Sequence, residues 1–108
     1  MAKISKNKLD KGIYDTILAQ LITAFKHCPG EKSVADLFDS LFTKTERLML
    51  AKRLAIALLL ERGRSYKDIS RLLKVSSVTI GLVRNNIMKN NQPYSDLIRN
   101  LSEALKNF

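Results

Sequence analysis

Residues 66–85, with the sequence YKDISRLLKVSSVTIGLVRN, contain two short amphipathic segments separated by a tight turn. Ser70 is small at the position where two such helices would come closest. Two short helices that meet at a steep angle through a three- or four-residue turn form a helix-turn-helix. The window predicts that motif, and an ordinary amphipathic helical hairpin is the alternative. The apolar anchors of the pair are Ile69, Leu73, Val75, Ile80 and Val83.

The charge of the chain is strongly positive around this window. Nineteen Lys and Arg residues against ten Asp and Glu give the 108 residues a formal charge of +9. Between Arg62 and Lys89 there are seven basic side chains and one acidic side chain, Asp68. This excess favours an anionic partner such as nucleic acid or an acidic membrane surface. A second basic cluster opens the chain, as an arm that grips a nucleic-acid backbone or as a solubilising tail. Its members are Lys3, Lys6, Lys8 and Lys11.

The cysteine content and the hydropathy pattern limit the compartment. The single cysteine, Cys28, cannot form an intrachain disulfide, so we expect a reducing, cytoplasmic location. The lysine-rich start is not followed by an apolar stretch, so no secretory leader is predicted. The longest strongly apolar run, Leu54 to Leu60, is far shorter than the roughly 20 residues that cross a bilayer. We therefore expect no membrane span.

Apolar residues recur at helical spacing along the chain. They predict a first helix over residues 10–27, which the Pro29-Gly30 pair ends. A hydroxyl side chain followed three residues later by an acid predicts a helix start. This signature occurs at Ser33–Asp36, Thr43–Glu46 and Ser65–Asp68. A last helix is predicted from about Pro93, with Leu97, Ile98, Leu101 and Leu105 on one face.

The predicted helix from Thr43 to about Arg62, which stops at Gly63, is apolar on nearly every side. A helix of this kind is normally buried, here under other helices or a second subunit. We therefore expect an all-α fold of about six helices in one domain over residues 1–108. Its parts are a basic arm (1–9), dimerisation and core helices (10–62), the helix-turn-helix (65–88) and a C-terminal helix (93–107).

Three features in this order resemble the Trp repressor superfamily: the Thr43-x-x-Glu46 box, the long helix with Arg53, and the helix-turn-helix that contains Ser-x-Thr-Ile at residues 77–80. The strings TKTERLMLAKRLAIALLLERGRSYKDI and VSSVTIGLVRNNI are most similar to its YerC/YecD-type branch. The resemblance implies an intertwined homodimer in which the N-terminal helices of the two chains wrap around each other. It also implies one helix-turn-helix per subunit, presented to successive major grooves.

In the Trp repressor, tryptophan controls affinity from a pocket between the long helix and the reading helix. The resemblance places the pocket threonine on Thr43 and one of two pocket arginines on Arg53. The second arginine falls on Leu82, which removes the flat cation expected to sandwich the indole. We therefore expect no cofactor and no tryptophan co-repressor. Arg53 then serves in a salt bridge or a cap, or lines a pocket with a different occupant.

The second helix of a helix-turn-helix enters the major groove, and the first lies across the backbone. The side chains expected to contact DNA are Lys67, Arg71, Lys74, Ser76, Ser77, Val78, Thr79, Gly81, Arg84, Asn85 and Lys89. Arg84 and Asn85 are the long planar side chains suited to base edges. Much of the specificity should therefore come from water bridges, a thymine methyl against Val78, and DNA shape. Lys74 occupies the turn position that most often holds glycine, at a cost on the order of 1 kcal/mol if φ is positive.

Catalysis is not predicted. The single histidine, His27, lies beside Cys28, and adjacent residues of a helix point to different sides. The sequence has no metal-ligand spacing and no glycine-rich phosphate loop. The sequence predicts a repressor-like transcription regulator that reads specific double-stranded DNA as a homodimer. The alternative is a non-enzymatic module that binds an acidic protein partner or RNA through the same basic face.

Overall fold

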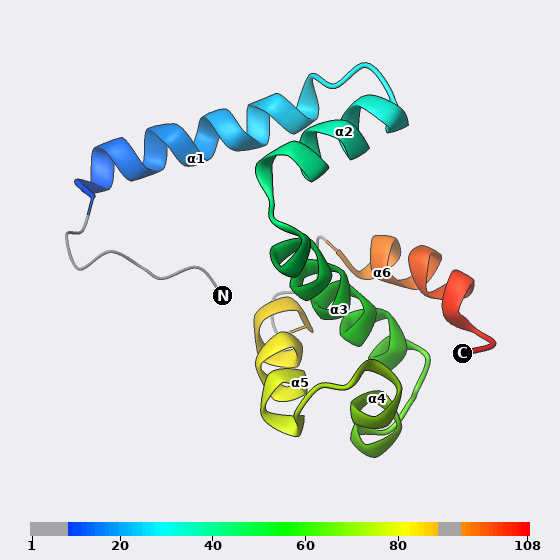
Figure 1. The fold of residues 1–108 in the computed structure, drawn as a ribbon. Coiled ribbons are helices and arrows are strands. Elements are labelled where there is room, and N and C mark those ends of the chain that lie inside the picture. Colours follow the sequence, from blue (N-terminus) through cyan, green and yellow to red (C-terminus); the bar gives the residue numbers. More distant parts are fainter. Residues whose placement is uncertain (1–8, 89–93) are drawn as a thin grey trace. The chain divides into compact units, whose positions relative to one another are not determined.

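The computed structural model describes residues 9–88 and 94–108, which form helices and turns (Figure 1). Six α-helices, one π-helix and one short 3-10 helix occur in this part of the chain, and no strand does. The fold is therefore all-α, as the sequence predicts. The chain divides into two compact units, residues 1–47 and 48–108, which we call the first and second unit. Most of the predicted basic arm, together with Lys89 and Pro93, lies outside the described residues.

The first unit contains α1 (Lys11–Lys26), α2 (Glu31–Leu41) and the start of α3 (Lys44–Glu61). The Asp10 carboxylate caps α1, because it accepts hydrogen bonds from the Gly12 and Ile13 amides at 2.8 and 3.4 Å. The predicted first helix over 10–27 is thereby confirmed. Lys11 belongs to this helix and pairs with Asp15 at 2.8 Å rather than extending the arm.

The prediction of Ser33 as a helix cap was wrong. Helix α2 begins at Glu31, directly after Gly30, so Ser33 lies inside its first turn. The Gly30 backbone is extended and no side chain caps the helix. Asp36 instead pairs with Lys32 at 2.9 Å, one helical turn away. The Pro29-Gly30 break already provides the change of chain direction, so the helix starts without the hydroxyl.

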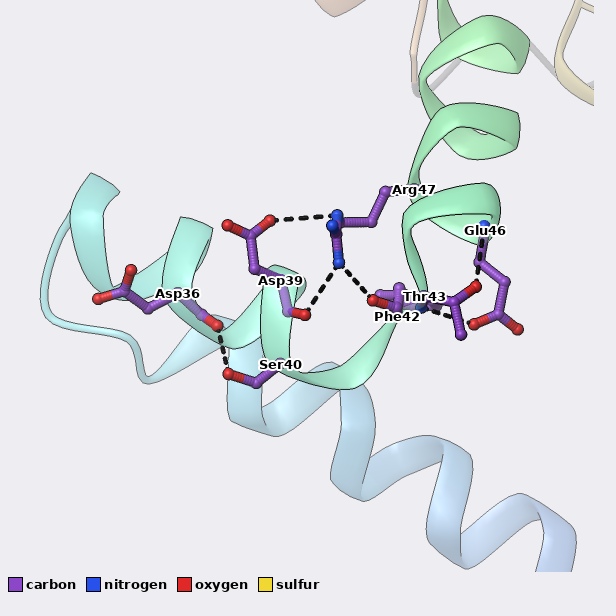
Figure 2. Close-up of polar contacts among 7 residues, drawn as sticks. All are labelled: Asp36, Asp39, Ser40, Phe42, Thr43, Glu46 and Arg47. Atoms are coloured by element: carbon purple, nitrogen blue, oxygen red, sulfur yellow. Dashed lines mark hydrogen bonds and ion pairs between the residues drawn. The ribbon is translucent and has the colours of Figure 1, made fainter.

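The link between α2 and α3 is held by a capping box and by Arg47 (Figure 2). Thr43 Oγ1 accepts from the Glu46 amide at 3.1 Å, and the Glu46 carboxylate accepts from the Thr43 amide at 2.9 Å. Hydrogen bonds from the Thr43 amide and hydroxyl hold the pKa of Glu46 below its ordinary value. Arg47 donates to the carbonyls of Asp39 and Phe42 at 3.0 and 2.6 Å. The end of one helix and the start of the next are thus satisfied together.

The core of the molecule lies in the second unit. It joins the C-terminal half of α3 to α4 (Tyr66–Leu73), α5 (Ser77–Val83) and α6 (Ser95–Ser102). The expected burial of the long helix is confirmed for this half alone, since Leu48, Leu50 and Leu54 remain 41–55% exposed. None of the helices described is long and apolar enough to cross a membrane. The buried core residues are Ile56, Ala57, Leu58, Leu59, Ile69, Ile80, Val83 and Ile98.

Two local features fix the ends of this core. Helix α3 ends at Glu61, and Gly63, two residues later, has a φ of 79° in the left-handed region that glycine adopts without steric cost. Helix α6 buries Ile98 and Ser102, and the Ser102 hydroxyl is satisfied by donating to the Arg99 carbonyl at 2.7 Å. Leu97 and Leu101, which the sequence places on the same face as Ile98, are 54% and 40% exposed. The short side chain of Ser102 therefore shares the buried face with Ile98 in the single chain.

Candidate nucleic-acid interface

Helices α4 and α5 form the predicted helix-turn-helix, two short helices that meet steeply across residues 74–76 (Figure 1). Ile69 of α4 and Ile80 of α5 are both fully buried in one core with α3. Leu73 and Val75 pack against the same core and are partly buried. The apolar anchors of the sequence pattern are confirmed, and they fix both helices to a rigid support.

Lys74 stands at the turn position that most often holds glycine, and the turn has the positive φ there that favours glycine. Lys74 is left-handed, with φ 57° and ψ 52°, although it is not glycine. Ser70 and Val75 bracket it with two hydrogen bonds. The Val75 amide donates to the Ser70 carbonyl at 3.3 Å, and the Ser70 hydroxyl donates to the Val75 carbonyl at 2.6 Å. The turn is therefore held closed by side-chain as well as backbone bonds.

Serine hydroxyls cap both helices. Ser65 Oγ accepts from the Asp68 amide at 3.1 Å, which confirms the predicted start of α4. Ser76 Oγ accepts from the Thr79 amide at 3.2 Å, and the hydroxyls of Ser76 and Thr79 lie 3.1 Å apart. Each cap satisfies an amide that the helix leaves unpaired. The capping fixes where α5 begins and therefore which of its side chains face outward.

The outward face of α5 is small and partly apolar. Ser77 is exposed, and Val78 and Leu82 are 70% and 54% exposed. A Cβ atom added at Gly81 would meet nothing within 4 Å, so packing within the chain does not require glycine there. Leu82, which the resemblance assigns to an effector pocket, lies one helical turn after Val78 on this exposed face. The face can approach a flat or grooved partner closely.

Helix α5 passes directly into a π-helix, η1 (Arg84–Met88). Arg84 and Asn85 are exposed in this segment. A π turn is wider than an α turn and often occurs at functional sites. The sequence pattern predicts continued helix to residue 88 but gives no sign of this change of period. The two side chains suited to base edges therefore project from the widened segment rather than from α5.

The basic side chains around the motif fall into two groups. Arg62 pairs with Glu103 at 3.5 Å, and Arg64 pairs with Asp68 at 3.8 Å and donates to the Phe108 carbonyl. The second group has no acidic partner within the described part of the chain and is exposed to solvent. Its members are Lys67, Arg71, Lys74 and Arg84. Uncompensated positive charge is thus concentrated on α4, the turn and the start of η1.

A hollow of about 300 Å³ lies between α3 and the turn, entirely within the second unit. Of the two second-unit residues that the resemblance assigns to a tryptophan pocket, Arg53 lines this hollow and Leu82 does not. Lys52 lines it as well, and sequence reasoning missed that residue because its neighbour Lys74 is distant in the chain. The full lining is Met49, Lys52, Arg53, Lys74, Val75, Ser76 and Thr79.

A second hollow, of about 380 Å³, lies along α4. It is lined by Arg64, Asp68, Arg71, Leu72 and Lys74, so Lys74 stands between the two hollows. The described residues include no group of three or more His, Cys, Asp or Glu side chains that could hold a metal ion. Each of the two hollows is lined by three cationic side chains.

A fold whose described residues are helical and which carries a basic helix-turn-helix on a half-buried support helix is that of helix-turn-helix, DNA-binding regulators. The chain belongs to the Trp repressor family, because the family model described as Trp repressor protein matches residues 16–102. This match extends across both units. No curated protein and no solved structure matches the chain. Assignment to the YerC/YecD-type branch stays a prediction.

Proposed function

We propose that the chain is a repressor-like regulator of transcription that binds specific double-stranded DNA as a homodimer. Helix α5 enters the major groove and α4 lies across the backbone, the usual docking of this motif. The observation that supports it best is that α4, the turn and the start of η1 carry exposed cations without an acidic partner among the described residues, while Ile69, Ile80 and Val83 of α4 and α5 are buried. A rigid cationic unit of this kind neutralises phosphates without first breaking ion pairs of its own.

The proposal assigns two kinds of contact. Lys67, Arg71 and Lys74 contact phosphates, because they are exposed and without an acidic partner within the described residues. For Lys67, on the first helix of the motif, a base contact is the alternative. Ser76, Ser77, Thr79 and Gly81 allow the backbone of α5 to approach the groove closely, since their side chains are short or absent.

Sequence readout comes from few groups. Arg84 and Asn85 supply hydrogen bonds to base edges. Val78, with 70% of its surface exposed, offers its methyl groups to a thymine methyl. Bridging waters and DNA deformability supply the remaining specificity, because long planar side chains are scarce on this face.

The surface of the first unit supports the homodimer. Its described residues include no buried side chain, so the single chain gives this unit no core of its own. Along α1, Ile13, Ile17 and Ile22 are 54%, 51% and 62% exposed. Apolar surface on this scale marks an interface. A second copy supplies the missing cover and, by symmetry, presents a second helix-turn-helix to the same duplex.

Electrophoretic retardation of duplex DNA at several salt concentrations tests this function. Wild type should lose affinity steeply with salt, because neutralised phosphates release counterions. The double variant Lys67→Ala/Arg84→Ala should abolish retardation while sedimentation still reports a dimer. The charge-matched control Arg99→Ala/Lys106→Ala removes two exposed cations of the second unit and should bind as wild type does. A shallow salt slope, or stronger binding to RNA or to an acidic protein, would reject the proposal.

A further inference from the structure

The hollow between α3 and the turn brings together cations from distant parts of the chain. Lys52 and Arg53 come from α3, and Lys74 comes from the turn that follows α4. Nothing in the local sequence pattern joins these positions, since the helix-turn-helix window begins only at residue 66. Their convergence is a property of the fold.

The charge of this hollow is uncompensated. Within the described residues, Lys52, Arg53 and Lys74 form no ion pair and no acidic side chain lines the hollow. By contrast, the nearby Arg62 and Arg64 both have acidic partners. Three like charges around one concavity repel each other, and an anion bound between them would offset this repulsion.

The hollow also contains a hydroxyl group that can donate a hydrogen bond to a ligand. Ser76 and Thr79 line it, and their hydroxyl oxygens are 3.1 Å apart. One of the two protons serves the bond between them, and the Ser76 oxygen accepts from the Thr79 amide. Whichever residue donates in that bond, the other keeps its proton for an outside acceptor. An oxyanion with several acceptor oxygens fits both the charge and this donor.

We propose that this hollow is a phosphate-binding site built jointly by α3 and the turn, with Lys52 and Arg53 as ligands in addition to Lys74. The phosphate group comes either from the DNA backbone or from a free phosphate compound. For the DNA source the proposal rests on the proposed function. It then extends the DNA contact beyond the helix-turn-helix onto the support helix.

The first arm of the test uses duplex DNA and the double variant Lys52→Gln/Arg53→Gln. The plot of log affinity against log salt should lose about one unit of slope, because one phosphate contact is lost. The exchanged variant Lys52→Arg/Arg53→Lys keeps both cations and should retain most of the slope. The control Lys106→Gln removes an exposed cation outside the hollow and should leave the slope unchanged.

The second arm titrates inorganic phosphate into the protein without DNA and follows the amide resonances of Ser76 and Thr79. Saturable shifts in wild type that vanish in Lys52→Gln/Arg53→Gln identify free phosphate as a sufficient ligand. A loss of DNA salt slope without such shifts identifies the DNA backbone as the source. Both results support the site.

The proposal is overturned if the double variant changes neither the salt slope nor the response to phosphate. The proposed function fails separately, if wild type shows no steep salt dependence on duplex DNA. In that case the phosphate titration alone decides whether the hollow binds phosphate. Absence of saturable shifts would reject the phosphate site. Circular dichroism of each variant checks that the helices are retained.

Discussion

Ser70 and Val75 are joined across the turn of the helix-turn-helix by two hydrogen bonds in opposite directions. The Val75 amide donates to the Ser70 carbonyl, and the Ser70 hydroxyl donates to the Val75 carbonyl at 2.6 Å. Ser70 and Val75 are both partly buried, so water replaces these bonds poorly. The pair therefore sets the geometry with which α5 leaves α4.

Ser70→Ala should lower the free energy of unfolding by about 1–3 kcal/mol, because the Val75 carbonyl loses its side-chain partner in a partly buried place. Denaturant unfolding measures this. The control is Ser40→Ala, since the Ser40 hydroxyl makes an equivalent bond to the Asp36 carbonyl at 2.7 Å but is exposed. That change should stay within about 0.5 kcal/mol. Equal effects of the two substitutions would contradict the role given to Ser70.

Lys74→Gly should lower DNA affinity without lowering the stability of the fold. The left-handed backbone at Lys74 costs on the order of 1 kcal/mol for a residue with a Cβ atom. Glycine removes this cost, and the greater freedom of glycine in the unfolded chain offsets part of the gain. The free energy of unfolding should therefore stay unchanged or rise by up to about 1 kcal/mol, while DNA affinity falls. Undiminished affinity would show that the cation at this position contributes nothing to binding.

Protonation of Glu46 at low pH should destabilise the N-terminus of α3. Hydrogen bonds from Thr43 lower the pKa of Glu46 in the folded chain relative to the unfolded chain. Its contribution to stability is therefore fully present above the unfolded pKa and is lost as the pH falls through the lowered, folded pKa. The Thr43 amide resonance should titrate with a midpoint below 4.5, the ordinary value. Glu46→Gln should abolish that titration, and a midpoint above 4.5 would be inconsistent with the capping box.

Tryptophan should not act as a co-repressor. Leu82 stands where the family resemblance expects the second pocket arginine, and it lies on the exposed face of α5 rather than in the hollow that Arg53 lines. Isothermal titration with L-tryptophan should therefore give no binding heat, and tryptophan should not alter DNA retardation. Micromolar binding would overturn this expectation. The matched variant is Leu82→Arg, which places an arginine at the second pocket position and should gain tryptophan binding.

Local patterns were sufficient to predict most of the second unit. Ile69, Ile80 and Val83 recur at spacings that a buried helix pair requires, and all three are buried. The left-handed turn at Lys74 follows from the same alignment of the motif. These features depend on neighbours within a few residues, which the sequence displays directly.

Other features depend on contacts that no local pattern contains. The hollow joins Lys52 to Lys74 through the packing of α3 on the turn, and the π-helix Arg84–Met88 changes the helical period although its own residues include no glycine or proline. The start of α2 was predicted wrongly for a different reason. Ser33 has the right chemistry, but the Gly30 break three residues earlier had already allowed the helix to begin.

Selection of bound sequences from random duplex DNA, with the size of each complex determined by sedimentation, decides whether the chain binds specific DNA as a symmetric dimer. We expect an enriched palindrome whose half-sites lie about one helical turn apart, bound by two chains. Recovery of no common sequence, or of an asymmetric site bound by one chain, would contradict this expectation.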